Sequence, residues 1–201
     1  MESEEPASPE PVRRRPGGRA ARVREAVLAA AAEAVIEHGV AKLTIADVAA
    51  RAGVNETTVY RRWGTRENLV LDALRTASDQ GIPVPDTGDV HTDLTTFATA
   101  LADYLATPLG HAVGRAAVLG ADDPALAEAW RTFWQARLDQ AAVMIHRAVD
   151  RGELPAGTDA ALAVELVAAP VQSRALLGHR AAEPGFAGRL AAAVLDGLRG
   201  R

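Results

Sequence analysis

The chain has 201 residues, of which 48% are hydrophobic and none is cysteine. This length suffices for one ordinary core or two small fused cores, and the lack of cysteine excludes disulfides, thiolate metal sites and cysteine nucleophiles. The longest apolar runs are alanine-rich, carry a charge and fall short of the roughly 20 residues of a membrane span. Because the Glu/Pro/Ser-rich start is also unlike a secretory signal, we expect a cytoplasmic protein without a membrane partner.

The net charge of −4 hides two oppositely charged parts. Residues 11–75 carry 12 Lys and Arg against 7 Asp and Glu, whereas residues 76–201 carry 10 against 15. A basic first third and an acidic remainder are typical of two parts with different partners. Chance segregation of solvated charges is the alternative, and charge alone does not decide between them.

Residues 1–18 are rich in proline, glycine and blocks of like charge. Such a segment buries too little apolar surface to offset the entropy of ordering it, so we predict a disordered tail. Arg13, Arg14 and Arg15 suggest an arm that enters a narrow minor groove of DNA. A solvated charge run without a fixed role is the alternative.

Short helices are predicted after the tail. Apolar residues recur at helical spacing from Val23 to Val35, and Gly39 supplies a stop. Thr44 is the expected N-cap of a short helix that ends at Gly53. A second short helix is expected to start at residue 55, and a longer one near residue 65.

The helix predicted over residues 55–63 has few apolar side chains and a polar remainder. Asn55 is its expected cap, and Val59 points to the helix before it. A short helix that buries one stripe and projects polar groups is typical of the recognition helix of a helix-turn-helix. Tyr60 and Trp63 either plug this small core or, for Tyr60, also reach a phosphate with the hydroxyl.

Longer helices are predicted beyond a Pro/Gly-rich linker at residues 81–89. One of about seven turns begins at Pro124 after an N-cap at Asp123, one runs from Ala160 to about Leu177 with a kink at Pro170, and one covers about residues 186–198. No alternating strand pattern is seen. We therefore predict an all-α chain of about nine helices, divided into a tail (1–18), a helix-turn-helix DNA-binding domain (19–65) and a C-terminal ligand-binding and dimerisation bundle (66–201).

The stretch "LTIADVAARAGVNETTVYRRWGTRENLVLDAL" at residues 43–74 resembles the DNA-binding segment of the TetR/AcrR family of transcriptional regulators. The likeness rests on the Leu-Thr before the first short helix, on Ala-Gly-Val, and on the spacing of Tyr60, Trp63, Arg66, Glu67 and Leu69. It covers the segment from about residue 23 to residue 74. The segment "ELVAAPVQSRALLG" is similar to a kinked penultimate helix of many members.

The resemblance implies a homodimer that pairs through its two C-terminal helices and binds a palindromic, double-stranded DNA operator. It also implies a repressor that a small molecule releases from DNA. By position, the family's DNA contacts fall on these residues: Thr44, Asn55, Glu56, Thr57, Thr58, Tyr60, Arg61 and Arg66. Glu56 departs from the Lys, Arg or Ser of many members. Its carboxylate either accepts from a cytosine amino group or only stabilises the helix N-terminus.

A helical bundle of this kind holds small ligands in an apolar cavity between its helices. The expected lining residues are Phe97, Tyr104, Trp130, Phe133, Trp134, Arg137 and Gln172, and core packing is the alternative for each. Because the three aromatic residues at 130–134 cannot all face one direction on a helix, we expect at least one to meet a cavity or a partner subunit. The lack of clustered charge favours an uncharged or weakly polar effector.

No catalytic or metal-binding pattern is found. The five histidines lack metal-ligand spacing, and neither a nucleophile elbow nor a phosphate-binding loop is present. We therefore expect no enzymatic activity, no metal and no cofactor. The sequence favours a ligand-responsive DNA-binding repressor. A helical small-molecule-binding protein with weakened or lost operator recognition is the alternative.

Overall fold

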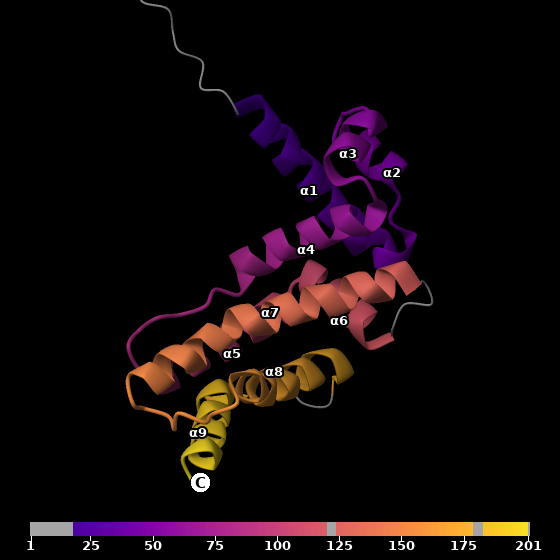
Figure 1. The fold of residues 1–201 in the computed structure, drawn as a ribbon. Helices are drawn as coiled ribbons and strands as arrows, with labels where there is room; N and C mark the ends of the chain where they lie inside the picture. Colours follow the sequence, from indigo (N-terminus) through magenta and orange to yellow (C-terminus); the bar gives the residue numbers. More distant parts are fainter. Residues whose placement is uncertain (1–17, 120–123, 179–182, 201) are drawn as a thin grey trace, which may run out of the picture.

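The computed structural model describes residues 18–119, 124–178 and 183–200. Over these residues the chain forms nine α-helices and a short 3-10 helix without any strand (Figure 1), which confirms the all-α prediction. The helices are α1 (Gly18–His38), η1 (Val40–Lys42), α2 (Ile45–Arg51), α3 (Glu56–Trp63), α4 (Arg66–Gly81), α5 (Val90–Ala106), α6 (Pro108–Leu119), α7 (Pro124–Asp150), α8 (Ala160–Leu177) and α9 (Phe186–Arg199). The arginines of the predicted arm and the expected cap at Asp123 lie outside the described residues.

Side-chain caps begin the short helices where the sequence predicted them. The Thr44 hydroxyl accepts a hydrogen bond from the Asp47 amide at the start of α2, and the Asn55 side chain accepts one from the Thr57 amide at the start of α3. Thr65 caps α4 in the same way. Each cap satisfies an amide that has no partner within its own helix, which fixes where the helix begins.

The first of two core clusters joins α1–α4 to the start of α7. It contains Val27 of α1, Val59 of α3 and Leu69 of α4, all fully buried, and it reaches Val113 of α6 and Phe133 of α7. The packed core thus continues across residue 65, where the sequence placed a domain boundary. As Figure 1 shows, α1–α4 form one end of the molecule and α7 extends from it toward the other.

The second cluster fills the bundle of α5, α7, α8 and α9, with buried side chains such as Leu94, Ile145, Val167 and Leu195. Helix α8 runs unbroken through Pro170. In the described part of the chain, α8 is the one helix whose length and composition would suit a membrane span. Its buried stripe contacts α5 and α7, however, as expected for a core helix of a bundle.

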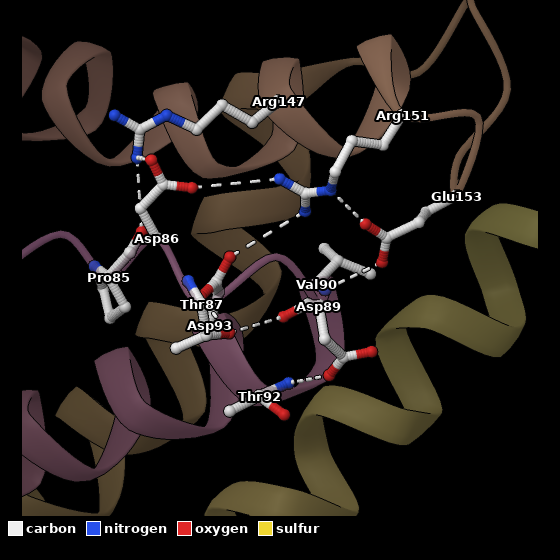
Figure 2. A network of polar contacts seen from close by, with 10 residues as sticks. All are labelled: Pro85, Asp86, Thr87, Asp89, Val90, Thr92, Asp93, Arg147, Arg151 and Glu153. Atoms are coloured by element: carbon white, nitrogen blue, oxygen red, sulfur yellow. Dashed lines mark hydrogen bonds and ion pairs between the residues drawn. The ribbon is translucent and has the colours of Figure 1, made fainter.

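A polar network closes the far end of the bundle, where the linker after α4 meets the α7–α8 loop (Figure 2). Asp93 is fully buried and accepts hydrogen bonds from the amide and the hydroxyl of Thr87, each at 2.8 Å. Arg151 contacts Asp86, Asp93 and Glu153. Glu153 in turn accepts from the amide of residue 90 at 2.8 Å. The network fixes the start of α5 and therefore the position of this helix in the bundle.

Candidate DNA-binding surface and ligand cavity

Helices α2 and α3 pack through a small apolar wedge. Ile45, Val48 and Ala49 of α2 and Val59 of α3 are all buried. Between the helices, Gly53 has a φ of 65°, a left-handed conformation that side-chain-bearing residues rarely adopt. Two short helices joined by such a turn form a helix-turn-helix, in which the second helix is placed to enter the major groove.

The outer face of α3 carries the polar side chains that the sequence assigned to DNA. Tyr60 is 50% exposed, whereas Trp63 is 7% exposed. The two aromatic residues thus divide the roles that the sequence left open: the Trp63 ring fills the core and the Tyr60 ring lies at the surface. The other exposed residues of the predicted set are Thr44, Asn55, Glu56, Thr57 and Arg61, and Thr58 is half-buried.

A basic groove lies between the start of α1 and α3. Arg19 of α1 and Arg61 and Arg62 of α3 all line it, and the guanidinium of Arg62 also lies 5.5 Å from the centre of the Trp63 ring. Three cations beside a candidate reading helix provide the electrostatic attraction that phosphate binding requires. Sequence reasoning missed Arg19, because only the packing of α1 brings it next to α3.

Two residues of the predicted DNA set differ from the others in their surroundings. The Arg66 guanidinium donates to Glu67 at 2.9 Å and to the Ala41 carbonyl at 3.1 Å, so it is held within the protein. Burial opposes ionisation of Glu67, yet its own backbone amide and Arg66 together hold the pKa of that carboxyl below its ordinary value. Glu56 lies exposed in the first turn of α3, where the negative charge of its carboxylate interacts favourably with the positive end of the helix dipole.

Trp63 connects α3 to α4. Its Nε1–H donates to Asp72 Oδ2 at 2.9 Å, and Asp72 also pairs with Arg24 of α1 at 2.5 Å. The Asn68 amide group donates to the Trp63 carbonyl at 2.9 Å. The C-terminal end of the candidate recognition helix is therefore tied to α4 and α1, and its orientation depends on both.

A cavity of about 300 Å³ lies among α4, α5, α6, α7 and α8. Of the residues that the sequence proposed for it, Phe97, Tyr104, Phe133, Trp134, Arg137 and Gln172 line the cavity. Trp130 is not among the lining residues: its indole is buried in the first core cluster and stacks on Trp134, with ring centroids 6.4 Å apart. Ser78 and Ile82 at the end of α4 also line the cavity, and no sequence pattern pointed to either residue.

Arg137 is the one cationic lining residue, and only 8% of it is exposed. Its guanidinium donates to Asp79 at 3.0 Å, to Gln140 at 2.6 Å and to the Ile82 carbonyl at 3.1 Å. Burial lowers the pKa of Arg137, and the neighbouring Asp79 carboxylate opposes that shift. The side chain thus fastens the end of α4 to α7 at the cavity wall.

Tyr104 faces the same region from α5. Its hydroxyl is buried and has no hydrogen-bond partner among the described residues. Burial raises the pKa of this phenol, and the positive charge of Arg137 opposes that shift. The Tyr104 ring also packs on the end of α4, because a Cβ on Gly81 would come within 2.5 Å of its Cδ2 atom.

The cavity continues into a second hollow of about 440 Å³ along α8. Both hollows share five lining residues: Leu105, Gly114, Trp134, Ala169 and Gln172. The second hollow adds residues farther along α8, including Ser173 and Leu177. No group of three or more His, Cys, Asp or Glu able to hold a metal occurs in the described part of the chain.

Together, a helix-turn-helix with an exposed polar helix and a helical bundle with an internal cavity define a DNA-binding regulator of the two-part kind. The sequence matches the family described as "Bacterial regulatory proteins, tetR family" over residues 27–73 and the "Tetracyclin repressor-like, C-terminal domain" over residues 84–194. The chain belongs to the TetR family, and it is a DNA-binding transcriptional regulator.

Individual relatives agree with this assignment. The chain is 45% identical to the HTH-type transcriptional regulator AqdR of Rhodococcus erythropolis over 146 residues, which cover 73% of this chain and 70% of AqdR. It is 32% identical to YdeS of Bacillus subtilis over 76% of this chain and 78% of YdeS. Among solved structures, the TetR family transcription regulator SCO0332 matches with a TM-score of 0.73 and 31% identity, over 88% of this chain and 98% of that one.

Proposed function

We propose that this chain is a homodimeric repressor that binds a palindromic operator through α3 and leaves it when a small molecule enters the cavity. The observation that carries the proposal is that α4 contacts both the candidate recognition helix and the cavity wall. Near its middle, α4 holds the recognition helix through Asp72 and Trp63, and at its end it is held at the cavity wall through Asp79 and Arg137. A ligand that moves the wall of the cavity therefore acts on the helix that orients α3. Because operator DNA is its partner, we also place the protein in the cytoplasm.

Dimerisation through α8 and α9 is supported by an apolar groove of about 650 Å³ between them. Leu162 and Leu166 of α8 are 45% and 46% exposed, which is unusual for leucines on a bundle helix. Leu190 and Val194 of α9 line the same groove. A second copy that covers this face by twofold symmetry would present two α3 helices to the two halves of a palindrome.

A DNA-binding measurement tests the proposal. The full chain is titrated against a labelled duplex taken from upstream of its own gene, with fluorescence anisotropy as the readout. Small molecules are then screened for those that lower the anisotropy. The proposal expects saturable binding with two chains per duplex, a two-chain mass by light scattering, and at least one compound that releases the DNA. A one-chain mass at micromolar concentration, or binding that no compound weakens, would contradict it.

A further inference from the structure

The cavity's chemistry narrows the class of its ligand. The inner walls are largely apolar and aromatic, with Phe97, Phe133 and Trp134 among the lining residues. Besides Ser78, Gln172 and the indole of Trp134, the lining residues with side-chain donors are Tyr104 and Arg137. An apolar cavity with few polar groups selects its ligand by its apolar shape and by the few hydrogen bonds that those groups make.

Both polar groups have donor capacity that the protein does not use. The Tyr104 hydroxyl is buried without a partner among the described residues. Arg137 makes three hydrogen bonds in the described structure, two through Nη1 and one through Nη2. A guanidinium carries five N–H groups and has no acceptor, so two of its donors remain available. The Tyr104 hydroxyl is buried, so its lack of a partner is costly, and an acceptor atom of a ligand relieves that cost.

The charge of Arg137 disfavours a cationic head group at this position. The guanidinium is buried at the cavity wall, so a cation bound next to it would face a like charge that the Asp79 carboxylate offsets in part. Glu165 is the carboxylate among the lining residues, and it lies exposed on α8. An oxygen acceptor, by contrast, meets the unused donors of both side chains.

The shape of the cavity and of the hollow that continues from it indicates the apolar part of the ligand. Because the cavity shares five lining residues with the hollow along α8, an apolar chain longer than the inner cavity has a continuous path toward Leu177. Leu176 packs directly on Gly114 along this path, since a Cβ there would come within 2.5 Å of a Leu176 methyl group.

We propose that the cavity binds a long apolar molecule with a single oxygen-acceptor head, a carbonyl or a carboxylate, which the Tyr104 hydroxyl and the Arg137 guanidinium hold while the apolar body lies along α8. This inference rests on the proposed function, in that the cavity is taken as the effector site. The head group binds Arg137, the side chain that holds the end of α4 against α7. A ligand whose head group fits this position therefore also acts on α4.

Three probes with alkyl chains of about seven to eight carbons and different heads test the inference: octanoate, nonan-2-one and octyltrimethylammonium. Their affinities for the full chain are measured by isothermal titration calorimetry. The inference expects octanoate or nonan-2-one to bind about tenfold more tightly than the ammonium probe. A ranking of octanoate over nonan-2-one identifies the charged acceptor, the reverse ranking identifies the neutral one, and both support the shared chemistry. Equal binding of all three, no binding by any, or preference for the ammonium would overturn it.

Variants assign the preference to the two side chains. Tyr104→Phe keeps the ring and removes only the hydroxyl, and Arg137→Met keeps most of the apolar stem. Each is expected to weaken the preferred oxygen-headed probe by about tenfold and to leave the ammonium probe unchanged or improved. Arg131→Ala, an exposed position of α7 outside the lining, is the matched control and should leave all affinities unchanged. If Arg137→Met does not fold, Tyr104→Phe alone decides, and an unchanged ranking there overturns the inference.

The inference and the proposed function fail in different ways. Operator binding is measured in parallel by anisotropy on the same protein preparations. Operator binding without any head-group preference overturns the inference alone. A head-group preference without operator binding leaves the inference standing and overturns the proposed repressor.

Discussion

The indole Nε1–H of Trp63 donates to Oδ2 of Asp72 across 2.9 Å, and this bond joins the last residue of α3 to the middle of α4. Because Asp72 also pairs with Arg24 of α1, the recognition helix is oriented by two neighbouring helices at one carboxylate. The aromatic residue that ends the polar helix is thus a positioning residue. We propose that it affects DNA binding through the orientation of α3.

Replacing Trp63 by phenylalanine should therefore lower both stability and operator affinity. Trp63→Phe removes the N–H and leaves Asp72 with Arg24 alone, which we expect to cost about 1–2 kcal/mol of unfolding free energy in a urea titration. Operator affinity should fall by about threefold to tenfold in an anisotropy titration. Trp130→Phe, in the same core cluster but on α7, should lower stability without weakening DNA binding. Equal effects of the two variants on DNA binding would contradict the positioning role.

Arg61 provides the most direct test of the basic surface. Arg61→Ala should weaken operator binding by about tenfold, and the slope of log K against log salt should become shallower by about 0.9. Arg131→Ala is the matched control, because Arg131 is an exposed arginine of α7 that pairs with Glu128. Unchanged salt dependence in Arg61→Ala would mean that this side chain does not contact phosphate.

Glu56 distinguishes base reading from helix stabilisation. If its carboxylate only favours the positive end of α3, Glu56→Gln should cost about 0.3–1 kcal/mol of stability and tighten operator binding, because a repulsion from phosphate is removed. The bases preferred in a selection from random DNA should stay the same. A changed preference at one position of each half-site would instead show that Glu56 accepts from a base.

The buried carboxylate of Asp93 should be the most sensitive residue of the network in Figure 2. Asp93→Asn replaces one acceptor oxygen by a donor in a fully buried site that accepts two hydrogen bonds from Thr87. We expect a loss of about 1–3 kcal/mol in urea denaturation. Asp86→Asn in the same network, with a side chain 57% exposed, should stay within about 0.5 kcal/mol. Similar losses in both variants would contradict the importance of burial.

Asp89 gives the stability a defined acid dependence. Hydrogen bonds from the Thr92 side chain and amide hold the pKa of the Asp89 carboxyl below its ordinary value. A lowered pKa means that ionised Asp89 contributes stability at neutral pH, and that this contribution is lost as the pH falls through the folded-state pKa. Asp89 caps the start of α5, and Asp89→Asn keeps an oxygen that can form this cap but carries no charge. Its melting temperature should lie below that of the parent at neutral pH and converge with it in acid, whereas a constant difference would contradict the assignment.

Local chemistry made the helix starts predictable. Thr44, Asn55 and Thr65 are short polar residues placed just before helical patterns, and a side-chain cap needs nothing beyond its own first turn. Gly53 was recognisable for the same reason, since the turn it makes is local. The class of the protein could be predicted because these local signals recur together at the spacing of a known family.

Residues whose role depends on distant packing were not predictable. Ser78 and Ile82 line the cavity only because the end of α4 meets α7, and neither residue type marks a binding site. Trp130 and Trp134 lie one helical turn apart and stack on each other. The sequence therefore did not show that, of these two residues, Trp134 lines the cavity and Trp130 does not. No sequence pattern pointed to Asp93, because its burial and its hydrogen bonds from Thr87 follow from the fold of the linker.

Selection of bound duplexes from random DNA tests the central claim most directly. The full chain and Arg61→Ala are each carried through the same rounds of selection and sequenced. If a dimer reads DNA through α3, the parent protein enriches an inverted repeat whose half-sites lie about one helical turn apart or a multiple of it, and Arg61→Ala enriches the same motif more weakly. Enrichment of no common motif, or of an unrepeated single site, would contradict the account.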